Sequence, residues 1–467
     1  MRSKNDSQGI LRFQRARLAL TEEYHARYEE IDCLLRASRG ILDLVHRDLK
    51  RSLESANKTR SRQCEYTSDH VLRILIVKTI EADTFRGVTV RVDDSDFLRW
   101  FTRIHGKDMM HFTLLNRLGN CIRPETWKRI NDSLGQQAVK AELIEGEKLR
   151  LDTTAVETNI HYPTDSSLLW DVYRVLSRLL ERARELFPKE VGNRRLQRRR
   201  VKKLYTSISR KASAKGMSSK KLKAPYSKLM GHVEAILDWT DDAVTGLEKR
   251  RKSRPGVAIS IDSVLSELQH FAGLGASVVD QARRRVLDGE QVPNHEKIFS
   301  IFEDHTELLK RGKAAKPIEF GHMILLQQVG GKFISDYQVF ENKPVEHQIV
   351  DPALRSHEKL FGHLPTVLTA DKGFYQSMAK IAELEERIEV VSIAKKGGRS
   401  EEEAERESDV LFKIAQKFRA GIEGTISFLK RCFRLFRCFN KGFVHYSATV
   451  GLTVFAHNLL VLVRDTS

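Results

Sequence analysis

The alternation of apolar and polar residues divides the chain into stretches with helical and with strand spacing. Apolar positions recur at helical spacing over 10–56, which predicts two or three amphipathic helices, and again over 68–137. The second stretch predicts short helices joined by polar turns, a pattern typical of a helix-turn-helix-like DNA reader. A plain helical packing domain fits this spacing equally well.

Strand patterns occur in two parts of the chain. The first is residues 147–160, and the second begins near Glu319. There an apolar run, Gly330-Gly331 and a returning run to Phe340 predict a hairpin with a two-residue turn. Two further short strands are expected at 366–369 and 388–393. Helices are predicted around and after them at 345–360, 375–386, 402–437 and 443–464.

The order of these elements indicates a fold class. Between the first strand and the hairpin, residues 166–316 are almost wholly helical by pattern. Without that stretch, the order is that of a ribonuclease H-like fold: three antiparallel strands, then crossovers to further strands. We therefore expect an α/β protein with a large all-α part. Its expected domains are a helical N-terminal extension (1–64), a helix-turn-helix-like DNA-binding domain (65–145), a ribonuclease H-like catalytic domain (146–165 and 317–467) and a basic helical insertion (166–316).

The charge of the chain indicates the kind of partner. Its 467 residues include 80 Lys and Arg against 62 Asp and Glu, which gives a net charge of +18. Such an excess favours a polyanion, nucleic acid before membrane, although a basic protein without a nucleic-acid role is the alternative. Four basic clusters fall in the expected insertion, with Arg198, Arg199 and Arg200 in the first. Together they predict a phosphate-binding surface, whereas single clusters are usually solvated helix faces.

The remaining composition bears on the cell compartment. Five cysteines without a Cys-x-x-Cys pair argue against a disulfide framework or a zinc finger and indicate a reducing cytoplasm. The start of the chain has no apolar signal-peptide core. The longest apolar run, 448–463, is short for a membrane span and contains polar residues, so we expect a buried helix.

Three acidic residues are the candidate catalytic and metal-binding groups. Asp152 lies in the first strand, Asp371 follows the strand at 366–369, and Glu423 lies in a predicted helix. An open α/β sheet places its chemistry at the carboxyl ends of strands, where these carboxylates can meet. Three carboxylates can hold two Mg²⁺ (or Mn²⁺) ions, which serve in-line attack on a phosphodiester. Taken singly, Asp152 is more typical of a turn or cap, and Asp371 also fits a helix cap. Lys372 is a candidate DNA contact beside them.

The helix around Glu423 carries cations on the same face. Arg419, Glu423 and Lys430 are spaced so that they share one side of a helix. This predicts a metal-holding carboxylate with phosphate-contacting residues on either side. The alternative, an exposed ion pair, does not explain why Gly421 and Gly424, poor helix formers, flank Glu423. Glycines there would let metal or DNA approach the backbone.

These motifs resemble those of a known family. Leu151 to Ser166 resembles the first catalytic block of bacterial insertion-sequence transposases of the DDE type, and Ala370 to Tyr375 resembles the second. Arg419-x3-Glu423-x6-Lys430 is similar to the third, a tyrosine-arginine-glutamate-lysine signature. Residues 70–135 look like the helical N-terminal domain common in these enzymes. One position departs from the pattern, because Gln416 stands where the signature has tyrosine.

The resemblance implies a ribonuclease H-like fold with two divalent ions held by Asp152, Asp371 and Glu423. It also implies endonuclease and strand-transfer activity on double-stranded DNA, at the terminal inverted repeats of a mobile element and at a target site. A homodimer assembled on DNA, in the bacterial cytoplasm at the nucleoid, is expected with it. Gln416 implies a missing helper contact to DNA rather than inactivity. The alternatives are a related nuclease that cuts without joining, and a degenerate copy that binds DNA without chemistry.

Overall fold

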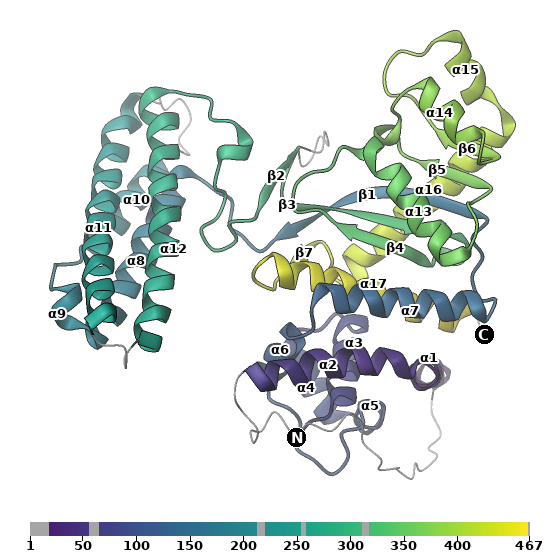
Figure 1. The fold of residues 1–467 in the computed structure, drawn as a ribbon, viewed down its shortest axis with the longest axis horizontal. Helices are drawn as coiled ribbons and strands as arrows, with labels where there is room; N and C mark the ends of the chain where they lie inside the picture. The colour runs from purple at the N-terminus through teal and green to yellow at the C-terminus, as the bar shows by residue number, and fades with distance from the viewer. Residues whose placement is uncertain (1–17, 56–64, 213–219, 254–257, 311–316, 466–467) are drawn as a thin grey trace. The chain divides into compact units, whose positions relative to one another are not determined.

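The chain is an α/β protein with a large helical part. The computed structural model describes residues 18–55, 65–212, 220–253, 258–310 and 317–465 (Figure 1). It divides into two compact units, one made of Met1–Thr158 and Gly321–Ser467 and the other of Asn159–Phe320. The sequence had placed the start and end of the insertion at 166 and 316.

Among the residues that the structure describes, seven helices precede the first strand. They are α1 (Ala19–Ala37), α2 (Arg39–Ser55), α3 (Ser68–Ile80), α4 (Phe85–Asp94), α5 (Asp96–Phe101), α6 (Phe112–Asn120) and α7 (Pro124–Lys140). Side-chain caps fix several starts: the Thr67 hydroxyl accepts from the His70 amide, and Thr84 accepts from Gly87. In helix α4 the β-branched valines and Gly87 weaken the helical pattern of the sequence. The cap at Thr84 is the signal that marks its start.

The first unit contains a mixed sheet. Its strands are β1 (Lys148–Thr158), β3 (Ile318–Gln328), β4 (Ile334–Val339), β5 (Val367–Ala370), β6 (Val390–Ile393) and β7 (Arg437–Cys438). The order is β3-β1-β5-β6, with β4 paired to β3 and β7 paired to β1. β3 runs antiparallel to β1 and to β4, whereas β5 and β7 run parallel to β1, and β6 parallel to β5.

The hairpin turn is longer than the two residues expected. Gly330–Lys332 forms a 3-10 turn, and both Gly331 (φ 64°) and Lys332 (φ 69°) are left-handed. Strand pairing also shifts register between Gln327 and Gln328. A bulge at that point consumes residues that a tight turn would leave in the strand.

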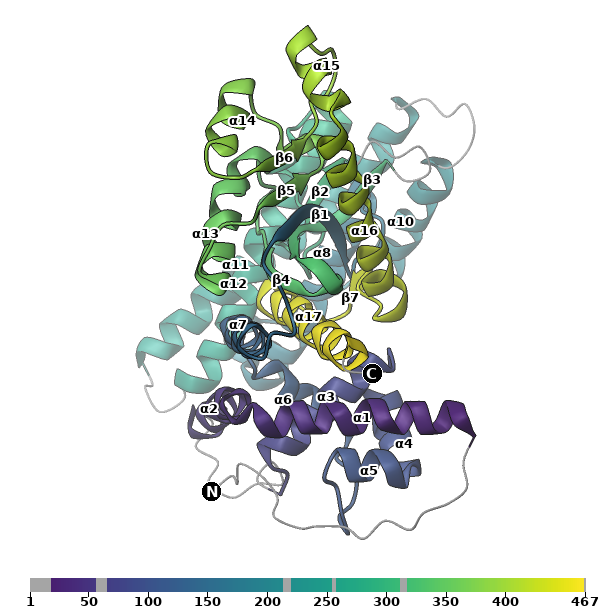
Figure 2. The same ribbon diagram turned by 90° about the vertical axis from the view of Figure 1, so that its right-hand side faces the viewer.

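Helices cover both faces of the sheet. Short turns η6 (Glu346–Ile349) and η7 (Lys372–Phe374) accompany helices α13 (Val350–Phe361), α14 (Met378–Glu385), α15 (Glu401–Ser408), α16 (Val410–Cys432) and α17 (Phe443–Asp465). Figure 2 shows α16 on one face and α13 and α14 on the other. α16 packs on β1, β5 and β6, and α17 packs on α1, α3 and α7.

The apolar run near the end of the chain is a core helix, as expected. α17 is long and apolar enough to cross a membrane, but 94% of its most apolar window is buried inside the protein. Its side chains join the helices before β1 to the sheet in one hydrophobic core. The burial of α17 inside the protein is compatible with a soluble protein.

The second unit is mainly a helical bundle with its own hydrophobic core. Its elements are α8 (Asp165–Leu186), α9 (Pro188–Val191), α10 (Arg198–Ala212), α11 (Lys220–Ser253), α12 (Ala258–Ala282), η3 (Arg283–Asp288), η4 (Asn294–Glu296) and β2 (Glu307–Lys310). α8, α11 and α12 pack on one another. The residues from Gly289 to Lys310 are mostly not helical, which differs from the expected pattern.

Candidate functional site

Strand register places Asp152 and Asp371 side by side. β1 and β5 are parallel neighbours, and their last paired residues are Leu151 and Ala370. Each aspartate directly follows its paired residue, so the two occupy equivalent positions on adjacent strands. Neighbouring strands lie about 4.8 Å apart. Two residues that are far apart in the sequence therefore meet at the carboxyl end of β5.

The electrostatics of Asp152 bring Glu423 into the same neighbourhood. The pKa of Asp152 is raised from 3.8 to about 6, mainly by burial and in addition by the negative charges of Asp371 and Glu423. A hydrogen bond from the Thr153 backbone and the positive charge of Arg419 act in the opposite direction. Asp371 and Glu423 are exposed, while Asp152 is only half-buried. The acidic cluster therefore opens to solvent on one side.

Helix α16 holds Glu423 through a chain of polar contacts to the sheet. Arg419 Nη2 donates to Glu423 Oε1 at 3.2 Å, and Arg419 Nε donates to Gln416 Oε1 at 3.2 Å. Gln416 Nε2 in turn donates to the Ser392 carbonyl of β6 at 2.8 Å. Gln416 therefore positions Arg419 within this site.

A buried arginine on β1 contacts α16 close to the residues of the acidic cluster. Arg150 lies two residues before Asp152, on the same face of β1. Its Nη1 donates to the Phe418 carbonyl at 2.6 Å, and its guanidinium lies 4.5 Å from the centre of the Phe418 ring. Burial lowers the pKa of Arg150 to about 10. Sequence reasoning missed this residue, whose only signal is an arginine on the strand face that also carries the candidate aspartate.

The close approach at Gly421 comes from this arginine. A Cβ on Gly421 would lie 2.2 Å from Arg150 Nη1, whereas a Cβ on Gly424 would meet nothing within 4 Å. The expectation that both glycines let metal or DNA approach the backbone is therefore wrong for Gly421, where the group that approaches is the side chain of Arg150. Gly424 remains open toward solvent.

A further carboxylate, not expected from the sequence, connects the segments that carry the two aspartates. Thr153 Oγ1 donates to Glu346 Oε1 at 2.5 Å. The other oxygen of Glu346 lies against Gly373, where a side chain would collide with it. Glu346 therefore ties the strand that carries Asp152 to the turn that follows Asp371. Only Gly373, at the centre of η7, leaves room for that contact.

The expected DNA-contacting residues are distributed over both units. Lys372 is exposed next to Asp371, and Lys430 is half-buried on α16. In the second unit Arg198 is ion-paired with Glu181 at 2.6 Å, while Arg199 and Arg200 are exposed on α10. These two leave their charge available to a partner.

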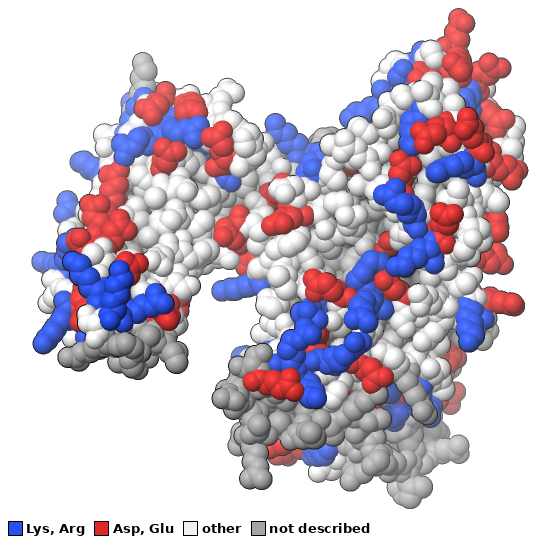
Figure 3. Space-filling view, viewed as in Figure 1, with Lys and Arg blue, Asp and Glu red and all other residues white. Residues whose placement is uncertain are grey.

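The last basic cluster of the second unit serves ion pairs inside that unit. Arg284 pairs with Glu290 and Glu296, and Arg285 Nη1 pairs with Asp165 Oδ1 at 2.8 Å. Arg283 pairs with Glu234. Figure 3 accordingly shows acidic and basic side chains interspersed over much of the visible surface. A phosphate-binding surface on this unit would therefore lie on α10, and the number of basic clusters in the sequence is no guide to it.

The donors at the acidic cluster suit a hard divalent cation. Asp152, Asp371 and Glu423 offer only carboxylate oxygens, the ligands that Mg²⁺ and Mn²⁺ favour. Across the described ranges, no three His, Cys, Asp or Glu side chains stand close enough together to hold an ion as placed.

Comparison with known proteins adds no assignment. No family model, no curated protein and no solved structure matches the chain.

Proposed function

We propose that this chain is a transposase of a bacterial insertion sequence that cuts and joins double-stranded DNA. The observation that carries the proposal is the meeting of Asp152 and Asp371 on paired parallel strands, with Glu423 within electrostatic reach. Nothing in the packing alone requires two aspartates at equivalent positions on adjacent strands. Like charges that are only partly neutralised, here by Arg419, cost stability, so their proximity is typical of a functional site.

The strand order supports a ribonuclease H-like catalytic domain. Along the sheet the order is β4-β3-β1-β5-β6, with the first three antiparallel and the last two parallel to β1. This is the sheet that a three-stranded meander followed by two crossovers makes. The second unit is inserted between β1 and β3, as the motif spacing requires.

Each residue of the acidic cluster has a role in the proposed reaction. Asp152, Asp371 and Glu423 would hold the divalent ions, which supply activation of the attacking water or 3′-hydroxyl and stabilisation of the leaving oxygen. Arg419 touches Glu423 and is placed to contact a phosphate oxygen. Lys372 offers a second, exposed cation beside Asp371.

The partners follow from the reaction proposed. The substrates are the terminal inverted repeats of the element and a target duplex, and pairing two ends requires a dimer on DNA. Exposed arginines on α10 provide a sequence-independent contact to phosphates. The proposed location is the bacterial cytoplasm, at the nucleoid.

The test is DNA cleavage by the purified full chain. A plasmid carrying the DNA that flanks its own coding sequence is incubated with Mg²⁺ and wild type or Asp371→Asn. We expect nicking at the element ends by wild type, none by the variant, and none by wild type when EDTA replaces Mg²⁺. The variant should still retard the same DNA in a gel, which separates lost chemistry from lost folding.

The same experiment distinguishes the alternatives. Products joined to a second plasmid identify strand transfer, whereas cut ends without joined products identify a nuclease. A folded wild type that binds the ends without cutting them refutes the proposal and leaves a DNA-binding remnant.

A further inference from the structure

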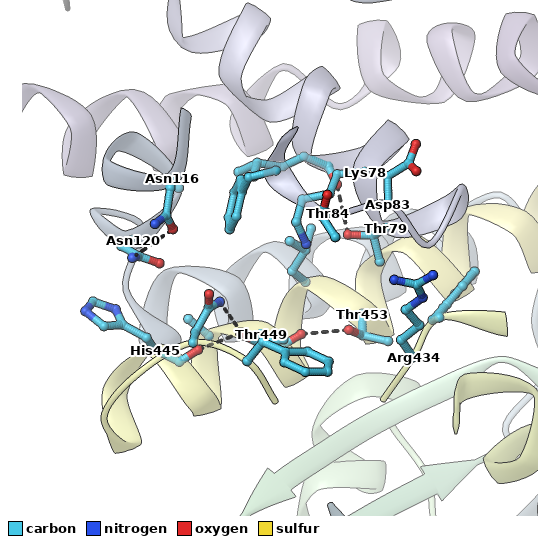
Figure 4. Close-up of a pocket in the computed structure, with 18 of the residues that line it drawn as sticks. Lys78, Thr79, Asp83, Thr84, Asn116, Asn120, Arg434, His445, Thr449 and Thr453 are labelled. Atoms are coloured by element: carbon cyan, nitrogen blue, oxygen red, sulfur yellow. Dashed lines mark hydrogen bonds between the residues drawn. The ribbon is translucent and has the colours of Figure 1, made fainter. Parts of the chain in front are cut away.

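A cavity lies between the helices before β1 and the last part of the chain, away from the acidic cluster. Its volume is about 460 Å³, and it is lined by residues of α3, α6, the turn after α3, the β7 region and α17 (Figure 4). All of these belong to the first unit. This volume is within the usual range for small-molecule sites.

One end of the cavity contains two cations without an acidic partner. Lys78 lines it from α3 and Arg434 from the segment before β7, and Figure 4 shows both side chains reaching toward the same space. Within the described residues, neither side chain forms a hydrogen bond or ion pair. Lys78 Nζ instead lies 4.7 Å from the centre of the Phe85 ring. The nearby carboxylate of Asp83 is already paired with Arg91.

Burial makes the charge of Lys78 costly when no anion is bound, whereas the side chain of Arg434 is exposed to solvent. Burial lowers the pKa of Lys78, and the positive charge of Arg434 lowers it further, although Cys438 and Asp83 act in the opposite direction. Two like charges beside an aromatic ring are stabilised when an anion with several oxygens binds between them. A phosphate has that charge and that number of acceptors.

The other end of the cavity offers neutral hydrogen-bonding groups. Asn120 Nδ2 donates to Asn116 Oδ1 at 3.2 Å, which leaves the Asn116 amide nitrogen and the Asn120 amide oxygen for a ligand. His445 contributes a buried Nδ1 that has no hydrogen-bond partner among the described residues. Figure 4 shows these three residues together, at the end opposite Arg434. The exposed ring of Phe439 also lines the cavity and provides a flat apolar face.

We propose that this cavity binds a nucleotide, with its phosphate between Lys78 and Arg434 and its base toward Asn116, Asn120 and His445. A base carries donors and acceptors on its edge, which match the amide and imidazole groups at this end, and it can stack on an aromatic ring such as that of Phe439, which also lines the cavity. The nucleotide has two possible sources, a free nucleotide or an unpaired nucleotide of a DNA strand. The inference does not depend on the acidic cluster, because no residue of that cluster lines the cavity.

The variants remove charge while preserving local structure. Lys78→Met replaces an unpaired, half-buried cation with an apolar chain of similar length, so the protein should fold with equal or greater stability. Arg434 has a left-handed backbone (φ 57°). Arg434→Asn is therefore preferred, since asparagine tolerates that conformation. Lys140→Met removes one exposed charge from α7, outside the cavity, and serves as the control.

The experiment is calorimetric titration of the full chain, in metal-free buffer, with each of the four deoxynucleoside monophosphates. We expect one saturable site per chain, at least about tenfold weaker binding in Lys78→Met and in Arg434→Asn, and unchanged binding in the control. The matching deoxynucleoside without phosphate and inorganic phosphate alone should each bind at least about tenfold more weakly. A thermal denaturation of every variant verifies folding.

Short single-stranded oligonucleotides, titrated in the same way, distinguish the two sources. Oligonucleotide binding that both variants weaken, with no binding of monophosphates, supports the site with DNA as the source. Equal sensitivity to the variants for monophosphates supports a free nucleotide. The proposal is overturned if folded wild type binds neither probe at millimolar concentration, or if neither variant changes the binding. It is also overturned if inorganic phosphate binds as tightly as the nucleotide.

Discussion

The ionisation of Asp152 should make the metal-free protein less stable at neutral pH than at pH 4. In the folded chain its pKa is raised from 3.8 to about 6, first by burial and then by Asp371 and Glu423. Between these two values the folded state binds more protons than the unfolded state, so stability falls as the pH rises. A tenfold change in acid dissociation corresponds to about 1.4 kcal/mol. The full effect is therefore about 2 to 3 kcal/mol, the lower figure allowing for solvent at this half-buried side chain.

Asp152→Asn removes the ionisation and keeps the shape. Relative to wild type, the variant should gain about 2 to 3 kcal/mol in free energy of unfolding between pH 4.0 and pH 7.5, measured by urea denaturation with EDTA. Asp94→Asn, an exposed aspartate at the end of α4, is the control and should change by less than about 0.5 kcal/mol at either pH. A stability difference between wild type and Asp152→Asn that is the same at both pH values would falsify the electrostatic account of the site.

Three further predictions test other parts of the site. Gly421→Ala must displace the buried guanidinium beneath it, and we expect a loss of about 1 to 2 kcal/mol in urea denaturation. Gly424→Ala, in open space on the same helix, should gain about 0.5 to 1 kcal/mol; equal effects would contradict the close approach at Gly421. Mg²⁺ at ten times its dissociation constant should stabilise wild type by roughly 1.4 kcal/mol and so raise its denaturation temperature, but not that of Asp371→Asn. Charge reversal at Arg199 and Arg200 should weaken DNA binding. It should also make the slope of log K against log salt concentration less steep, by about 0.9 for each phosphate that is no longer neutralised. Reversal of the ion-paired arginine just before them should do less, and an unchanged salt dependence would exclude α10 from the DNA surface.

The proximity of the two aspartates could be predicted from the sequence. Each follows a short apolar run, and parallel strands of an open sheet end at one edge, so the expected topology was enough to bring Asp152 and Asp371 together. A buried helix at the end of the chain was also expected, because the apolar run at 448–463 is short for a membrane span and contains polar residues, although α17 itself extends further on the N-terminal side. Both inferences use only the period of the local pattern and the direction of the chain.

Contacts between distant elements were not predictable in this way. Glu346 reaches Thr153 and rests against Gly373, although no local pattern relates η6 to β1. Likewise, the basic run at 283–285 looks like a phosphate site in the sequence, but its arginines meet acids of the same unit. The number of basic residues in a segment predicts a phosphate-binding surface only when the ion-pair partners of those residues are known.

Gly421 shows the same limit within the candidate site itself. A glycine in a helix indicates that something approaches the backbone, but the sequence does not say whether the group is a metal, a phosphate or a side chain. Here it is the guanidinium of Arg150, which reaches across from β1. That contact fixes the distance between the strand carrying Asp152 and the helix carrying Glu423. The glycine therefore belongs to the geometry of the acidic cluster, through the packing of α16 on the sheet rather than through direct contact with a ligand.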